Sequence, residues 1–117
     1  MATEQLPRDS WRAYFDDLSR TAGATEVTIE IAGSDLGDQI AAEQLILTGI
    51  TYDDGDDLLV VGLEAPGSST EEYEHMIDSP QQIQVATQED GTTTVEVTDP
   101  EGDHHLVHLQ PAPALPS

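Results

Sequence analysis

The segments DDGDD at 53–57 and HHLVH at 104–108 are the two stretches whose residue types suggest metal chemistry. A calcium loop of the EF-hand type that starts at Asp53 needs oxygen ligands at its first, third and fifth positions and glycine at its sixth. Here the third position is Gly55 and the sixth is Leu58, so the pattern is broken. We expect no specific calcium site, only weak and non-specific attraction of cations by the many carboxylates.

The histidine-rich segment supports a metal site only if it is helical. On a helix, His104 and His108 would share one face and could bind the same ion. On a strand, four residues span about 13 Å, which is too far for one ion. The alternation of residues 104–109 favours a strand, with His104 and His108 exposed and His105 partly covered. The chain has no cysteine, which excludes disulfides, zinc–thiolate sites and thiol catalysis. The sequence therefore predicts no metal and no cofactor.

His75 lies in the segment EHMIDSP at 74–80, where it could act as a general base near Glu72, Glu74 or Asp78. The sequence places no Ser, Cys or second His beside it in a known catalytic arrangement. A hydrogen bond from His75 to the backbone near Pro80 is the simpler interpretation. The segment AGSDLGD at 32–38 has neither a GxGxxG pattern nor a P-loop lysine, so a nucleotide-binding fold has no support. We predict no catalytic residue.

The charge of the chain is its most extreme property. Twenty-four acidic residues face three basic ones, the formal net charge is −21, and there is no lysine. The three arginines, Arg8, Arg12 and Arg20, all lie within the first twenty residues. Because phosphate contacts need Lys or Arg, direct binding of nucleic acid is not expected.

Three explanations of the acidity remain open. The first is adaptation to high salt, because at molar ionic strength the screening length falls to about 3 Å and dense carboxylates repel one another weakly. The second is a protein partner with a basic surface. The third is disorder, which the regular alternation of apolar residues disfavours. The first is the interpretation that the composition favours.

Residues 7–21 are expected to form an amphipathic helix. Trp11, Tyr14, Phe15 and Leu18 fall at positions i, i+3, i+4 and i+7 and form one apolar stripe. This stripe most simply packs against a sheet.

From Thr25 onward, apolar and polar residues alternate with a period of two, which predicts strands. A capping box of Ser69 and Glu72 predicts a short helix that ends before Pro80. Because helices do not alternate with strands, we predict an α+β fold of mostly antiparallel β structure, a curved sheet or small barrel, with one N-terminal amphipathic helix and a short helix near 70–78. The expected strands are 25–31, 39–45, 46–52, 58–63, 82–88, 92–98 and 104–109.

Three loops share one hairpin pattern, in which a type I turn is followed by a glycine in the left-handed region. They are DDG at 53–55, EDG at 89–91 and PEG at 100–102. Each loop sets the register of the strands that it joins, with apolar side chains on one face. The predicted pairs are Ile50–Leu58 for the first loop, Val85–Val95 and Ile83–Val97 for the second, and Val95–Val107 and Val97–His105 for the third.

The chain is expected to form a single domain over residues 1–110, followed by a Pro-rich tail at 111–117. Its longest apolar run, residues 58–63, is far shorter than the roughly 20 residues of a membrane helix. Residues 1–8 lack the pattern of a signal peptide. We therefore predict a cytoplasmic protein with no membrane partner.

Several segments, in order, resemble an uncharacterised prokaryotic family. They are LPRDSWRAYFDDLSR, VTIEIAGSDLGDQ, LTGITYDDGDDLL, HMIDSP and DPEGDHHLVHL. The family is catalogued as domain of unknown function 5335, and the resemblance covers about residues 6–116. It implies a short, single-domain, mostly cytoplasmic prokaryotic protein, and it implies no activity, cofactor or site residue. The chain departs from the family by its lack of lysine and by the acidic segment APGSSTEEYE, which again favours salt adaptation.

Two main hypotheses for function follow. The leading one is a non-enzymatic binding or accessory protein, whose partner surface includes Trp11 or Tyr52 if either side chain is exposed. His75 is a further candidate interaction residue.

The alternative is a small-molecule-binding domain or enzyme with a pocket near His75, Asp35, Asp38 and Gln39. That hypothesis requires these side chains to converge around one concavity. A weaker third possibility is a homodimer formed through a sheet edge.

Overall fold

The computed structural model describes residues 2–21, 25–33, 37–65, 72–89 and 91–110. Its strands are β1 (Ala2–Gln5), β2 (Glu26–Gly33), β3 (Gly37–Asp53), β4 (Leu58–Glu64), β5 (Glu72–Asp78), β6 (Gln82–Thr87), β7 (Thr93–Thr98) and β8 (His104–Gln110). All eight belong to one sheet with the order β1-β6-β7-β8-β2-β3-β4-β5, and every neighbouring pair is antiparallel. The prediction of a mostly antiparallel β fold is confirmed.

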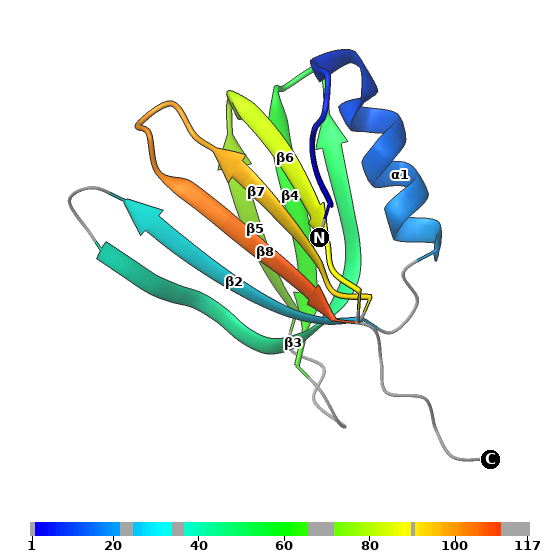
Figure 1. Cartoon of the computed structure of the whole chain (residues 1–117), viewed down its shortest axis with the longest axis vertical. Helices are drawn as coiled ribbons and strands as arrows, with labels where there is room; N and C mark the ends of the chain where they lie inside the picture. The colour runs from blue at the N-terminus through cyan, green and yellow to red at the C-terminus, as the bar shows by residue number, and fades with distance from the viewer. Residues whose placement is uncertain (1, 22–24, 34–36, 66–71, 90, 111–117) are drawn as a thin grey trace.

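The sheet curls because β3 is long and irregular. β3 has 17 residues; its first part pairs with β2 and its last part, from Ile46, pairs with β4. The register shifts in both ladders, and such bulges bend a strand and increase its twist. As a result β4 and β5 lie behind β8 and its neighbours in Figure 1. The sheet is curved but not closed, because β1 and β5 remain as its two edges.

The N-terminal helix forms as expected. A 3-10 turn, η1 (Arg8–Ser10), leads into α1 (Trp11–Thr21), and α1 lies along the last part of β3 (Figure 1). Ser19 fixes this contact, because its hydroxyl donates to the carbonyl of Ile50 (2.7 Å) and accepts from the backbone N–H of the same residue (2.9 Å). Trp11 and Phe15 are fully buried on the inner face of the helix.

One hydrophobic core fills the concave side of the sheet. It consists mainly of Leu, Ile and Val side chains from β2 to β8, with Trp11, Phe15 and Tyr52 as its aromatic members. Trp11 and Tyr52 meet edge to face, with ring centroids 5.2 Å apart. Burying this apolar surface is the main stabilising contribution to the fold.

The last three strands form the predicted meander. Val85 pairs with Val95, and Val95 with Val107. Gly91 and Gly102 have φ values of 92° and 87°, as the hairpin pattern requires. Both predicted registers of this meander are confirmed, including the pair of Val97 with His105.

The register predicted for the loop at 53–55 is wrong. Asp53 pairs with Leu58, and Ile50 pairs with Val61 instead of Leu58. The Asp53 side chain accepts the backbone N–H groups of Gly55 (2.9 Å) and Asp56 (3.2 Å), which builds a longer turn. In this turn Asp57 has the positive φ, at 50°.

The short helix predicted near 70–78 is also wrong. Residues Glu72–Asp78 form strand β5, which pairs with β4 along its whole length. Tyr73, His75 and Ile77 alternate with residues that are acidic except for Met76, so the segment fits a strand as well as a helix, and the ladder with β4 decides between them. Ser69 of the expected capping box lies outside the described residues.

Two further strands differ from expectation. The predicted strands 39–45 and 46–52 are parts of the single strand β3. β1, which pairs with β6, was not predicted, because its four residues carry no apolar alternation.

Candidate functional site

A chain of three polar side chains joins β5 to β8 on the concave side of the sheet. Nε2 of His75 lies 2.9 Å from Nδ1 of His105, and Nε2 of His105 lies 2.9 Å from Oδ2 of Asp99. In the sheet order β5 and β8 are separated by three strands, so only the curl brings these residues together. We call them the Asp99–His105–His75 chain.

The turn between β7 and β8 holds Asp99 in place. Its Oδ1 accepts the backbone N–H groups of Glu101 (2.9 Å) and Asp103 (3.0 Å). The side chains of Asp99 and His105 are only 17% and 10% exposed. The same turn that sets the β7–β8 register therefore points the second carboxylate oxygen at His105.

Protonation states follow from the donors and acceptors. An ionised Asp99 only accepts hydrogen bonds, so Nε2 of His105 must carry a proton. If His105 is neutral, its Nδ1 is then an acceptor, and Nε2 of His75 must donate to it. Both ring nitrogens of His105 are engaged in this arrangement.

Burial and neighbouring groups shift the pKa values of His75 and Asp99. Burial lowers the pKa of His75, and the neighbouring His105 lowers it further. Burial alone would raise the pKa of Asp99, but hydrogen bonds from His105, Asp103 and Glu101 outweigh it and the net pKa is lowered. Asp99 is thus charged and His75 neutral at pH 7.

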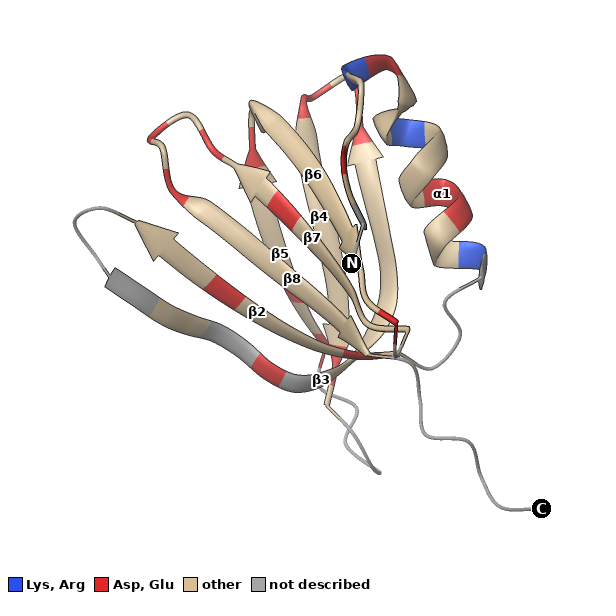
Figure 2. Ribbon diagram, viewed as in Figure 1, with Lys and Arg blue, Asp and Glu red and all other residues tan. Residues whose placement is uncertain are grey.

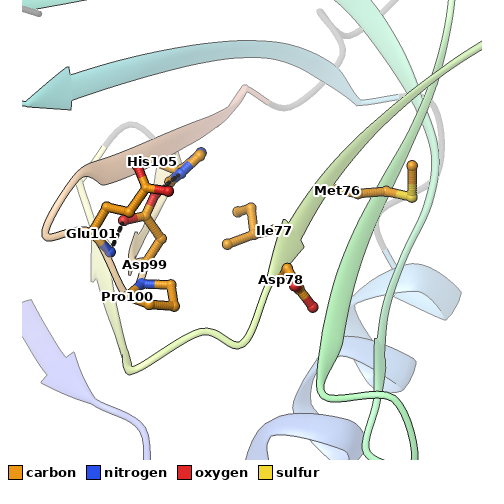
Figure 3. Close-up of a pocket in the computed structure, with 7 residues that line it drawn as sticks. All are labelled: Met76, Ile77, Asp78, Asp99, Pro100, Glu101 and His105. Atoms are coloured by element: carbon orange, nitrogen blue, oxygen red, sulfur yellow. Dashed lines mark hydrogen bonds and ion pairs between the residues drawn. The ribbon is translucent and has the colours of Figure 1, made fainter.

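A cavity of about 180 Å³ lies beside this chain. Figure 3 shows Asp99, Pro100, Glu101 and His105 on one side, with Ile77 of β5 pointing toward them, whereas the Asp78 carboxylate points away from them. The lining residues are Met76, Ile77, Asp78, Asp99, Pro100, Glu101 and His105. Asp99 and Glu101 on one wall, with Asp78 at the edge, give the cavity a negative charge.

The other two histidines of the HHLVH segment lie on the opposite face of β8. His104 lies 3.3 Å from the carboxylate of Glu96, and His108 lies 3.1 Å from that of Glu30. β8 is a strand, so they do not converge on one point. Among the described residues no group of three or more His, Asp or Glu side chains is placed to hold a metal ion.

Trp11 and Tyr52 do not form an exposed surface. They are only 2% and 5% exposed and belong to the core. The Tyr52 hydroxyl donates to Asp57 (2.5 Å), and the guanidinium of Arg8 lies 4.5 Å from the centre of the Trp11 ring. Since a partner surface at Trp11 or Tyr52 depended on exposure, their burial removes its basis.

The predicted pocket near His75 has different members. Asp35 and the side chain of Asp38 lie outside the described residues. Gln39 is exposed on β3, where its backbone pairs with Ile31. His75 instead meets His105 and Asp99, which the sequence did not single out as partners. The segment DPEGDHH at 99–105 could have indicated the contact of Asp99 with His105, because an Asp that begins a turn can reach a His on the inner face of the next strand.

Positive charge is confined to the N-terminal part of the molecule. Figure 2 shows Arg only on α1 and just before it, whereas Asp and Glu are spread along α1, the strands and the turns. Each arginine has an acidic neighbour, and the three ion pairs are exposed: Arg8–Asp57 (3.2 Å), Arg12–Asp54 (3.6 Å) and Arg20–Asp17 (3.0 Å). No arginine is among the described residues that line the cavity beside Asp99.

Comparison with known proteins agrees with the resemblance seen in the sequence. The model of a family described as "Family of unknown function (DUF5335)" matches residues 2–117. The chain belongs to this family. An uncharacterized protein of Aquifex aeolicus (strain VF5) is 35% identical over 116 residues, which cover 99% of each chain. No solved structure matches the chain.

The one helix of the described residues is too short to cross a membrane.

Proposed function

We propose that this member of the family is a non-enzymatic binding protein, and that the cavity beside Asp99 takes a cationic group. The fitting chemistry is an ammonium or guanidinium on an apolar stem. Carboxylates of Asp99 and Glu101 would accept its hydrogen bonds, Asp78 would add negative charge at the edge of the cavity, and Ile77 and Pro100 would contact the stem.

The observation that carries this proposal is the use of both ring nitrogens of His105. One nitrogen contacts Asp99 and the other contacts His75. The only histidine that lines the cavity is thus occupied, and the described lining includes no Ser, Thr, Tyr or Lys. What remains toward a ligand is negative charge and apolar surface, which favours binding over acid–base or nucleophilic chemistry.

The charge of the cavity follows from its construction. The pKa of Asp99 is lowered by its hydrogen bonds, so this carboxylate stays ionised well below pH 7. A partly buried carboxylate attracts a cation more strongly than an exposed one, because solvent screens it less. The cavity should therefore bind cations more tightly than the remaining acidic surface does.

Affinity for arginine amide tests this proposal. In the double variant Asp78→Asn/Glu101→Gln, two lining carboxylates become neutral while Asp99 keeps its turn. We expect binding at least about fivefold weaker, which corresponds to roughly 1 kcal/mol. The matched control is Asp9→Asn/Glu89→Gln, which removes the same charge from exposed positions outside the cavity. An equal loss in both double variants would show only general attraction to an acidic protein.

The acidity outside the cavity is a separate matter. We propose that it reflects adaptation to high salt, which the complete absence of lysine supports. A cytoplasmic location fits this proposal, since salt adaptation of this kind acts on a protein in its bulk solvent.

A further inference from the structure

β5 is the longer of the two edges of the sheet. It has seven residues, whereas the other edge, β1, has four. Within the described part of the chain its backbone pairs with β4 only. An edge strand presents a row of N–H and C=O groups that can pair with another extended chain.

The side chains of β5 are unusually open for a strand. Tyr73 is 44% exposed and Met76 is 57% exposed, and they are two of the three large apolar side chains that are exposed in the described residues. Glu72, Glu74 and Asp78 are exposed on the same strand. The edge therefore combines a strand with no second described strand beside it, two exposed apolar side chains and three negative charges.

Charge selects the occupant of this edge. A second copy paired antiparallel about His75 would place Glu72 opposite another Asp78, at both ends of the pairing. Like charges directly opposite in a sheet are destabilising, whereas opposite charges stabilise a pair by about 0.2–1 kcal/mol. A basic strand is favoured over a second copy of this chain.

We propose that β5 is the docking edge for an extended basic polypeptide, which adds to the sheet as a further strand. This inference rests on the proposed function, because the cation bound in the cavity would be a side chain of that polypeptide. Asp78 is both the last residue of β5 and part of the cavity lining. A basic residue opposite Asp78 shares its outer face and lies at the end of β5 that borders the cavity.

The register of β5 defines a probe. Its outer-face residues are Glu72, Glu74, Met76 and Asp78, two residues apart. An antiparallel partner should carry Lys opposite each acid and an apolar residue opposite Met76. The peptide Lys-Thr-Leu-Thr-Lys-Val-Lys meets this pattern. Its control has N-methyl groups on the adjacent Leu and second Thr, so that one methyl must face β5 in either orientation while the charge is unchanged.

Calorimetry and hydrogen exchange of the full chain with both peptides test the inference. We expect the unmodified peptide to bind at least about tenfold tighter than the methylated one and to slow amide exchange in β5. The variant Glu72→Gln/Glu74→Gln should bind it at least about fivefold more weakly, whereas the control Asp9→Asn/Glu89→Gln should lose much less. Equal affinity of the two peptides would overturn the inference, because strand pairing would then contribute nothing.

Arginine amide in the same series separates the two proposals. If arginine amide binds through the cavity but the two peptides do not differ, the cation site stands and the edge inference fails. If the peptide pairs with β5 but arginine amide ignores the cavity, the proposed function fails. Dimerisation through β5, detected by light scattering and abolished by the peptide, would replace the basic partner with a second copy and overturn the inference.

Discussion

Replacing Asp99 with Asn tests the polar chain that underlies the candidate site. Asn keeps an oxygen for the backbone N–H groups of Glu101 and Asp103, so the turn is retained. It removes the charge that faces His105 at 2.9 Å. The Asn amide can donate to His105 only if both histidines reverse the positions of their protons. The change therefore isolates the charge of Asp99.

We expect Asp99→Asn to lower the free energy of unfolding by about 2 kcal/mol, because a buried hydrogen bond to a charged group contributes about 1.5–3 kcal/mol. For a domain of this size that corresponds to a Tm lower by about 8 °C. The matched control is Glu96→Gln, which removes the charge beside His104. That pair is much more exposed, at 36% and 46%, so its loss should stay below about 0.5 kcal/mol.

The stability of the fold should decrease as the pH is lowered. The folded pKa of His75 is lowered, so the unfolded chain binds this proton more readily, and stability falls as pH drops below about 6.5. The folded pKa of Asp99 is also lowered, so a second loss begins below about pH 3.9. Asp99→Asn should remove the second loss.

Urea denaturation followed by the fluorescence of Trp11 measures these effects. Trp11 is the only tryptophan and is 2% exposed, so it reports unfolding directly. Curves at pH 7.5, 5.5 and 3.0 in constant KCl would give the free energy of unfolding on both sides of each expected loss. The reasoning is refuted if Asp99→Asn is as stable as the parent at pH 7.5, or if Glu96→Gln costs as much.

Three other predictions concern the rest of the fold. The Tm should rise markedly as KCl increases toward molar concentration, because screening weakens the repulsion of a chain with net charge −21; a flat salt series would contradict salt adaptation. Arg8→Ala should cost about 1–2 kcal/mol, since it removes a hydrogen bond to the Pro80 carbonyl (3.0 Å) and a cation–π contact with Trp11; the control Arg20→Ala, which loses only an exposed pair, should change urea midpoints little. Gly102→Ala should cost about 1 kcal/mol from its φ of 87° alone, because the added methyl meets no atom within 4 Å; a thermal melt without any shift would count against strain at this turn.

Much of the fold could be predicted from local patterns. The stripe of Trp11 and Phe15 predicted the helix, and the EDG and PEG loops predicted the meander, because turn chemistry and apolar alternation act over a few residues. The prediction of a short helix was wrong because the sequence of β5 suits both the helical and the strand periodicity. Only its partner β4 decides the outcome, and pairing between separate strands is not visible in a local window.

The candidate site was less accessible to sequence reasoning. The sequence singles out His75 and predicts a partly covered His105, but its patterns assign no role to Asp99. Their meeting depends on the curl of β3, which follows from bulges at positions such as Leu47–Gly49. Such bulges leave no fixed mark in a single sequence. Trp11 and Tyr52 illustrate the opposite error, since aromatic residues that could serve a partner are used here in the core.

The most direct test of the central claim is an NMR titration of the isotope-labelled chain with arginine amide and, separately, with citrulline amide. The two ligands have nearly the same shape and both carry an α-ammonium group, but only the first carries a guanidinium. If the cavity beside Asp99 binds cations, arginine amide should shift the backbone amides of Ile77 and Glu101 in a saturable way, and citrulline amide should shift them much less at the same concentration. Equal shifts from both ligands, or shifts spread over all acidic residues without saturation, would contradict the account.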